Sequence, residues 1–142
     1  MMGVPYGGCN VLASALTFDK HTCNTYLKSF GVNVANSVML TRGMEYDVNE
    51  IIGEVGLPCF VKPNAEGSSF GVTKVKEAGQ LEEALKTAFA LCREVLVETF
   101  IDGTELTCGV VKAGDLDFAM PIAEVIPKKE FFDFEAKYDP KM

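Results

Sequence analysis

The sequence offers little for metal or disulfide chemistry. Its 142 residues include one histidine, His21, and five cysteines, an odd number with no two close together in the chain. None of them has metal-ligand spacing, and no cysteine has an identifiable base beside it. We therefore expect no metal site in this chain and reduced, unreactive cysteines, which is typical of a cytoplasmic protein.

Long apolar runs and excess positive charge are also missing. No apolar stretch approaches the ~18 residues that a membrane span needs, and no basic segment followed by an apolar one marks a secretory signal. The net charge is −7, and an acidic surface repels phosphate backbones, so we expect no nucleic-acid partner and no membrane partner. A small anion such as a nucleotide is compatible with this charge where a few lysines gather locally.

Internal repeats and low-complexity tracts are absent as well. The composition, 48% hydrophobic and 23% charged, is ordinary for a folded domain with a sizeable core. The length suits one compact domain, or a small domain with part of a neighbour. The chain opens on a Gly/Pro-rich loop and ends abruptly after Asp139-Pro140, so we expect both ends to be cuts inside a longer protein.

Hydrophobic periodicity and breaker residues predict one small α+β unit in which helices and antiparallel hairpins alternate. One helix is expected to begin at an Asp19 cap and to end before Gly31. Asp102-Gly103 is predicted to form a tight hairpin turn, near which two subdomains could join. The expected helices are residues 11–18, 19–30, 46–55 and 80–92. The expected strands are residues 32–40, 59–63, 72–75, 94–100, 104–111 and 118–126.

A loop of small and polar residues follows the strand that ends at Lys62-Pro63. Its glycines let the backbone approach a ligand, its serines offer hydroxyls, and successive N–H groups can cradle phosphate oxygens. A Walker A loop would lead into a helix, whereas here a strand follows, so the loop tops a β-hairpin and could close as a lid. The alternative is an ordinary flexible connection. The loop residues are Glu66, Gly67, Ser68, Ser69, Phe70 and Gly71.

Two lysines flank this loop in the predicted fold. Lys20 opens a helix and Lys62 ends a strand. Two ammonium groups that converge on one point would neutralise a polyphosphate. The sequence does not show whether they converge, and a solvated surface charge is the ordinary alternative for each.

Glutamates mark the end of the strand at residues 94–100. Glu98 shares a strand face with Leu96, so its carboxylate needs a hydrogen-bond donor, and the exocyclic amine of adenine could supply one. Backbone groups of Phe100 and Ile101 could complete the adenine edge, and Glu105 could accept both ribose hydroxyls. The alternative is a pair of surface glutamates near a turn.

Aromatic and charged residues mix without periodicity at residues 131–138 (FFDFEAKY). This pattern indicates a loop that packs across a site, where Lys137 and Tyr138 could meet a transferred phosphoryl group and the lid. A polar tail is the alternative.

Taken together, these segments resemble the D-alanine–D-alanine ligases of the ATP-grasp superfamily, in the order in which that family has them. The motif FVKP followed by EGSSFG, at residues 60–71, is specific to this family and its near relatives, and EAKY at residues 135–138 narrows the match. The stretches that carry the resemblance are residues 3–20, 57–75, 95–111, 121–127 and 131–138.

The resemblance implies an α+β fold with three parts. Residues 1–18 would be a connecting loop and short helix, and residues 19–102 the ATP-grasp central subdomain, an antiparallel sheet with helices packed on one face. Residues 103–142 would be the truncated start of the C-terminal ATP-grasp subdomain.

The resemblance also implies a role for each matching residue. Lys20 and Lys62 would bind phosphates, and residues 66–71 would form the lid. Other roles follow the family motif in the same way: Ser69 would contact the transferred phosphate, Ser68 would hydrogen-bond Tyr138, Glu98, Phe100 and Ile101 would bind adenine, Glu105 would bind ribose, and Lys137 would stabilise the moving phosphoryl group. Two departures are Thr99, where many relatives carry a basic residue, and Phe134, where tyrosine is common.

The implied activity joins two D-alanines with ATP, through an acyl phosphate, to make a peptidoglycan precursor. The implied cofactors are ATP and Mg²⁺, whose ligands would lie outside this chain, and the parent enzyme would be a homodimer. We therefore expect the isolated chain to be inactive and to bind ATP weakly. Two alternatives stay open: another ATP-grasp ligase, such as a D-alanine–D-lactate ligase, and a non-catalytic nucleotide-binding module.

Overall fold

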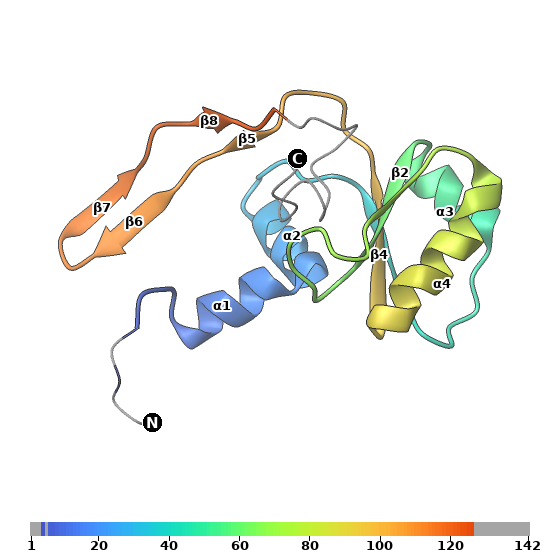
Figure 1. Ribbon diagram of the computed structural model, residues 1–142, viewed down its shortest axis with the longest axis horizontal. Helices are drawn as coiled ribbons and strands as arrows, with labels where there is room; N and C mark the ends of the chain where they lie inside the picture. Colours follow the sequence, from blue (N-terminus) through green and yellow to red (C-terminus); the bar gives the residue numbers. More distant parts are fainter. Residues whose placement is uncertain (1–3, 5, 127–142) are drawn as a thin grey trace, which may run out of the picture. The chain divides into compact units, whose positions relative to one another are not determined.

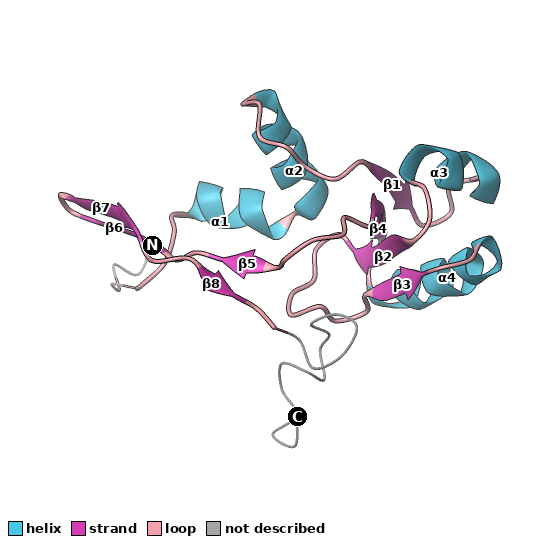
Figure 2. Ribbon diagram, turned by 90° about the horizontal axis from the view of Figure 1, so that it is seen from above, coloured by secondary structure: helices cyan, strands magenta, loops and turns pink. Residues whose placement is uncertain are grey.

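The computed structural model describes residue 4 and residues 6–126, and the chain divides into two compact units. The first ends at Phe100 and the second begins at Ile101. Each unit has sheets of its own, and their elements can be followed in Figures 1 and 2. The boundary expected after residue 102 stays a prediction. The predicted site residues Lys137 and Tyr138 lie outside the described residues.

One four-stranded sheet organises the first unit. Its strand order is β1-β4-β2-β3, and every neighbouring pair is antiparallel. The strand β4 lies between β1 and β2, so both of its edges are hydrogen-bonded inside the sheet. The α+β fold class is thereby confirmed. The strands are β1 (Ser37–Thr41), β2 (Cys59–Pro63), β3 (Thr73–Val75) and β4 (Glu94–Thr99).

One face of this sheet carries the hydrophobic core. Side chains alternate between the two faces of a strand, and the register Leu40↔Val95 together with Val61↔Val97 aligns apolar residues across the sheet. The helices α3 (Val48–Val55) and α4 (Leu81–Leu91) cover this face, and Figure 1 shows them on the same side of β4. The buried core residues are Leu40, Ile51, Val55, Cys59, Val61, Val75, Leu81, Ala84, Leu85, Ala88, Val95 and Val97.

The other face of the sheet is mixed and polar. One cross-strand row aligns Ser37, Glu98, Phe60 and Lys74, and the next row aligns Met39, Leu96 and Lys62. Because the pleat alternates, every one of these side chains leaves the sheet away from the core. We call this surface the polar sheet face. It brings a predicted phosphate-binding lysine and a predicted adenine-binding glutamate onto one surface.

Two helices precede the sheet. The helix α1 (Val11–Phe18) is capped by Asn10, whose side chain accepts a hydrogen bond from Ala13 N at 2.8 Å. The helix α2 (Lys20–Ser29) is capped by Asp19, whose carboxylate accepts from Thr22 N at 2.8 Å, as the sequence predicted. Gly31 follows α2 in the left-handed region, at a φ of 78°, which confirms its predicted place just past the helix end.

The second unit contains two antiparallel pairs. The strand β5 (Leu106–Thr107) pairs with β8 (Ala123–Glu124), and β6 (Val110–Ala113) pairs with β7 (Leu116–Ala119). Gly114, with a φ of 59°, makes the turn between β6 and β7. This turn lies in the connection between the two strands predicted at residues 104–111 and 118–126.

Several predicted elements need correction. The hairpin at Asp102-Gly103 is wrong, because β1 and β2 already occupy both edges of β4 and leave none for the following chain. The two long strands expected in residues 104–126 are four short ones, because the chain changes pairing partner between them. The extended segment at 32–40 is a strand only from Ser37, and the helix expected from Tyr46 begins after the Asp47 cap. Among the described residues, no helix is long and apolar enough to cross a membrane.

Candidate functional site

An ion pair occupies the centre of the polar sheet face. The ammonium of Lys62 bonds Oε2 of Glu98, and Asn24 Nδ2 donates to the other carboxylate oxygen, Oε1, at 3.2 Å. The side chains of Lys62 and Glu98 are only 20% and 14% exposed. A carboxylate removed from water to this degree needs such partners. The structure thus brings Lys62 and Glu98 together, which the sequence did not predict.

Two aromatic rings lie beside this ion pair. The ring centroids of Phe60 and Phe100 are 5.9 Å apart, and Lys74 Nζ lies 3.8 Å from the centroid of Phe100. Phe60 also faces Glu98 directly across the strands β2 and β4. The result is an apolar surface bordered by one carboxylate and by the cations of Lys62 and Lys74, which suits a flat aromatic ligand with polar edges.

The second predicted lysine lies at the base of the Gly/Ser loop. Lys20 Nζ donates to the carbonyl oxygens of Pro63 at 3.1 Å, Asn64 at 3.2 Å and Glu66. These three acceptors match the three N–H donors of an ammonium group. Lys20 therefore ties the first turn of α2 to the end of β2 and the start of the loop.

The electrostatics of Lys20 link it to the second predicted lysine. Burial lowers the pKa of Lys20, and the positive charge of Lys62 lowers it further. Cys92, Glu66 and Asp19 oppose these effects without cancelling them. A partly buried ammonium group that experiences a second positive charge is unfavourable, and an anion would relieve this.

The capping residue Asp19 is hydrogen-bonded to Asn64, at the base of the Gly/Ser loop. Burial raises the pKa of its carboxyl group, but hydrogen bonds from Thr22 and Asn64 and the nearby His21 outweigh burial, and the pKa lies below its ordinary value. The ionised form of Asp19 is thus favoured in the folded chain. Its carboxylate caps α2 on one side and accepts from Asn64 Nδ2 at 2.8 Å on the other.

The Gly/Ser loop has an unusual backbone. Ser68 and Ser69 have φ values of 55° and 60°, in the left-handed region that residues other than glycine rarely adopt, and Gly71 has a φ of 70°. Each such serine costs on the order of 1 kcal/mol or more. Turns of this kind can direct successive N–H groups toward an anion. The loop connects β2 to its antiparallel partner β3, as predicted.

Other predicted site residues belong elsewhere. Ile101 and Glu105 are part of the second unit, where Glu105 O accepts from Val125 N at 2.8 Å, so their contacts with adenine and ribose stay predictions. The contact between Ser68 and Tyr138 and the role of Lys137 lie outside the described residues. Within the described part of the chain, no group of three His, Cys, Asp or Glu residues could hold a metal ion.

Four residues of this site were missed from the sequence. Asn24 follows Lys20 by four positions and so lies on the same helix face, a signal that was available. Phe60 and Lys74 alternate with core residues on their strands, which marked them only as facing away from the core. Asn64 is buried at the base of the loop, and its sequence context carried no signal of that.

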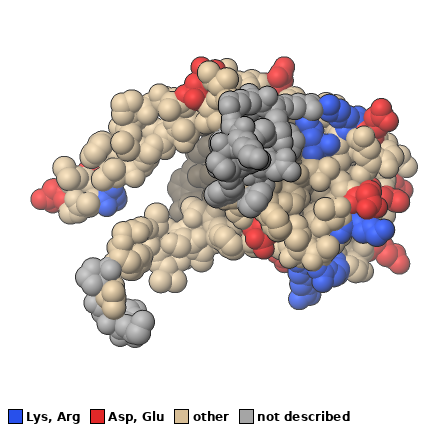
Figure 3. Space-filling view, viewed as in Figure 1, with Lys and Arg blue, Asp and Glu red and all other residues tan. Residues whose placement is uncertain are grey.

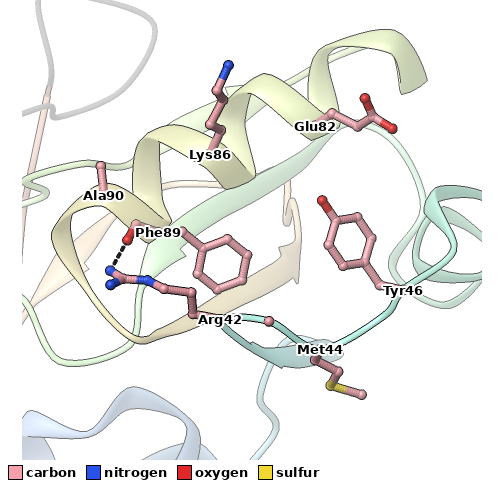
Figure 4. A pocket seen from close by; sticks show the side chains of 8 residues that line it. Arg42, Met44, Tyr46, Glu82, Lys86, Phe89 and Ala90 are labelled. Atoms are coloured by element: carbon pink, nitrogen blue, oxygen red, sulfur yellow. Dashed lines mark hydrogen bonds between the residues drawn. The ribbon is translucent and has the colours of Figure 1, made fainter.

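A separate pocket of about 600 Å³ lies between α4 and the β1–α3 connection. Figure 4 shows Tyr46 and Phe89 in this pocket, with Arg42 bonded to the carbonyl of Phe89. None of the predicted site residues lines it. Figure 3 shows acidic and basic groups interleaved over the first unit, without a continuous basic patch on the described part of the face in view.

Several solved ligase structures resemble this chain. The VanG D-Ala:D-Ser ligase of Enterococcus faecalis matches with a TM-score of 0.82 and 37% identity, covering 92% of this chain and 38% of that one. The D-alanine–D-alanine ligase of Bacillus anthracis in complex with ATP matches with a TM-score of 0.74 and 30% identity, covering 87% of this chain and 40% of that one. The fold of this chain is thus the one found in these ligases of the ATP-grasp superfamily.

Sequence comparison narrows the class to one family. The profile described as "D-ala D-ala ligase C-terminus" matches residues 26–142, and the chain belongs to this family. A D-alanine–D-alanine ligase of Phocaeicola vulgatus is 52% identical over 139 residues, and one of Parabacteroides distasonis is also 52% identical over 139 residues. These matches cover 98% of this chain but only 43% and 42% of the two relatives. The chain therefore spans less than half the length of the relatives that it matches.

Proposed function

We propose that this chain forms the nucleotide-binding part of a D-alanine–D-alanine ligase. The parent enzyme joins two D-alanines at the expense of ATP and supplies a precursor of peptidoglycan, on which the cell wall and cell shape depend. The single observation that carries this proposal is the gathering of Lys62, Glu98 and the Phe60–Phe100 pair on the polar sheet face. The names of the relatives point to the same activity.

Adenine binds at the aromatic end of this face in our proposal. The rings of Phe60 and Phe100 contact the base, and the carboxylate of Glu98 accepts from its exocyclic amine. Glu98 is held by Lys62 and Asn24. A carboxylate oxygen has two lone pairs, so Asn24 can keep its bond while the amine takes a free site. Backbone groups of Ile101 bind the same edge of adenine.

The phosphates lie at the lysine end. The ammonium group of Lys62 moves away from Glu98 and binds the polyphosphate. Lys20 replaces one of its hydrogen bonds to a backbone carbonyl with a hydrogen bond to a phosphate oxygen. The left-handed backbone at Ser68 and Ser69 supplies N–H groups to the terminal phosphates. The carboxylate of Glu105 accepts hydrogen bonds from the ribose hydroxyls. A polyphosphate would thereby offset the effect by which the positive charge of Lys62 lowers the pKa of Lys20.

The reaction itself is a pair of displacements. A carboxylate oxygen of the first D-alanine attacks the γ-phosphorus, and ADP leaves with the electrons of the broken P–O bond. The amine of the second D-alanine then attacks the acyl carbon, loses a proton, and inorganic phosphate leaves. Positioning and charge neutralisation by Lys20, Lys62, Ser69 and Lys137 are the contributions of this chain, with Ser68 and Tyr138 holding the lid.

Magnesium ions would neutralise the polyphosphate in such a reaction. The groups around the proposed phosphate site are cations and backbone donors, and the described residues offer no cluster that fits Mg²⁺. We propose that the Mg²⁺ ligands come from parts of the parent enzyme outside this chain. A cytoplasmic homodimer is the proposed state of the parent enzyme.

A second candidate function differs in the second substrate of the ligase. The 37% identity to a D-Ala:D-Ser ligase supports a ligase that joins D-alanine to another D-residue, such as D-serine or D-lactate. The test uses the complete natural chain that contains residues 1–142. ADP release is measured with D-alanine alone and with D-serine or D-lactate as the second substrate. We expect release with D-alanine alone; no release with any of these substrates would contradict the proposed function.

A further inference from the structure

A buried asparagine joins the two parts of the proposed phosphate site. Asn64 follows the last residue of β2 and has 0% of its surface exposed. Of the residues that the structure describes, it is the only polar one in the buried class. A buried amide costs stability unless its donors and acceptor are all paired, so its neighbours decide what it does.

Every polar group of the Asn64 side chain has a partner. Oδ1 accepts from His21 N at 2.9 Å, and Nδ2 donates to Asp19 Oδ2 at 2.8 Å and to Glu94 Oε2 at 3.3 Å. One N–H donor and two carboxylates surround the amide, and only this orientation of its oxygen and nitrogen satisfies all three. The side chain therefore bonds α2 and β4 at once.

The backbone of Asn64 completes the connection. Its N–H donates to Glu94 O at 2.9 Å, and its carbonyl accepts from Lys20 N at 3.2 Å and from Lys20 Nζ at 3.2 Å. The bonds to Asp19 and His21 flank Lys20 on both sides. The position of the Lys20 main chain is thus set by Asn64, and so is the start of the loop that leads to Ser68 and Ser69.

We propose that Asn64 is a positioning residue, which holds Lys20 and the base of the 66–71 loop at the spacing that the triphosphate requires. This inference rests on the proposed function, because it assumes that Lys20 and the loop bind phosphate. Asn64 itself touches no substrate. It acts through the first turn of α2, and no other side chain in residues 6–126 duplicates its pairing of two carboxylates with one N–H group.

The critical variant is Asn64→Asp, which keeps the shape and removes both donors. The new carboxylate faces Asp19 and Glu94, so the first turn of α2 is pushed away from β2 and Lys20 moves with it. We expect the KM for ATP in D-alanine-dependent ADP release by the complete natural chain to rise about tenfold, while the KM for D-alanine changes less than about twofold. The matched control is Asn49→Asp, the same change at an exposed position of α3, for which we expect no change in either KM.

A compensating variant separates positioning from folding. Asp19→Asn combined with Asn64→Asp restores one donor–acceptor pair between the two positions, with the roles exchanged, and should recover part of the ATP affinity. If Asn64→Asp does not fold, Asp19→Asn alone is measured, because Asp19 is partly exposed and asparagine also caps helices. It should raise the KM for ATP by about threefold.

The outcomes are distinguishable. An unchanged KM for ATP in folded Asn64→Asp, or in Asp19→Asn where Asn64→Asp does not fold, would overturn the inference. A loss of folded protein with normal kinetics in the remainder would show a merely structural role and would also overturn it. Lys20→Met tests the underlying assumption separately: if it leaves the KM for ATP unchanged, the proposed phosphate role of Lys20 fails, whatever Asn64 does.

Discussion

Replacing Gly71 by alanine should destabilise the first unit through the backbone of its Gly/Ser loop. Gly71 has a φ of 70°, and an added Cβ would lie 2.4 Å from Leu91 Cδ1 and 3.0 Å from Pro63 Cγ. The left-handed backbone costs about 1–2 kcal/mol for an L-residue. The end of the Leu91 side chain can rotate away at about 0.5–1.5 kcal/mol, whereas the ring of Pro63 has less freedom. We therefore expect a loss of about 2–3 kcal/mol in the free energy of unfolding.

The control for this prediction is the same substitution in a helix. Gly53 lies inside α3, has no atom within 4 Å of an added Cβ, and has no left-handed φ. Gly53→Ala should stabilise the chain by up to about 1 kcal/mol, because glycine is a poor helix residue. Urea unfolding followed by circular dichroism measures both variants. If Gly71→Ala is as stable as the parent chain, or more stable, the loop geometry described above is wrong.

Three further predictions concern other parts of the first unit. Burial raises the pKa of the Cys59 thiol, so Cys59 should react with a thiol reagent only after unfolding. Cys9 and Cys108 are exposed and should react in the native chain. Equal reaction rates for all three thiols would contradict this prediction. The pKa of Asp19 is lowered on folding, so the stability from its ionised form is present above its unfolded pKa and is lost as the pH falls below about 4. Asp19→Asn should reduce that pH dependence in urea titrations, and an unchanged slope would count against the hydrogen bonds described. Thr99→Val removes the 2.8 Å bond from Thr99 Oγ1 to the carbonyl of Val55, and should lower the free energy of unfolding by about 1 kcal/mol; no loss in urea unfolding would count against that bond.

Local patterns predicted most of the helices and strands of the first unit. Asp19 and Gly31 marked the two ends of α2, because capping depends on neighbours within a few residues. The pairing partners of the strands were harder to predict from the sequence. The false hairpin at Asp102-Gly103 followed from good turn residues, but turn residues do not reveal that both edges of the preceding strand are already occupied.

The same distinction applies to the site. Lys62 and Glu98 were predicted one at a time from their positions at strand ends, and their ion pair was not, because it depends on the register of β2 against β4. Asn64 was missed because its partners Asp19 and Glu94 are 45 and 30 residues away in the chain. Residues that act by joining distant segments carry little local signal.

The most direct test of the central claim is to find where adenine binds. The complete natural chain is labelled with the photoreactive analogue 8-azido-ATP, with and without excess ATP, and the labelled peptides are mapped. We predict ATP-protected labelling in the peptides that carry Phe60 and Phe100. Labelling confined to the pocket of Tyr46 and Phe89 in Figure 4, or labelling that ATP does not suppress, would contradict it.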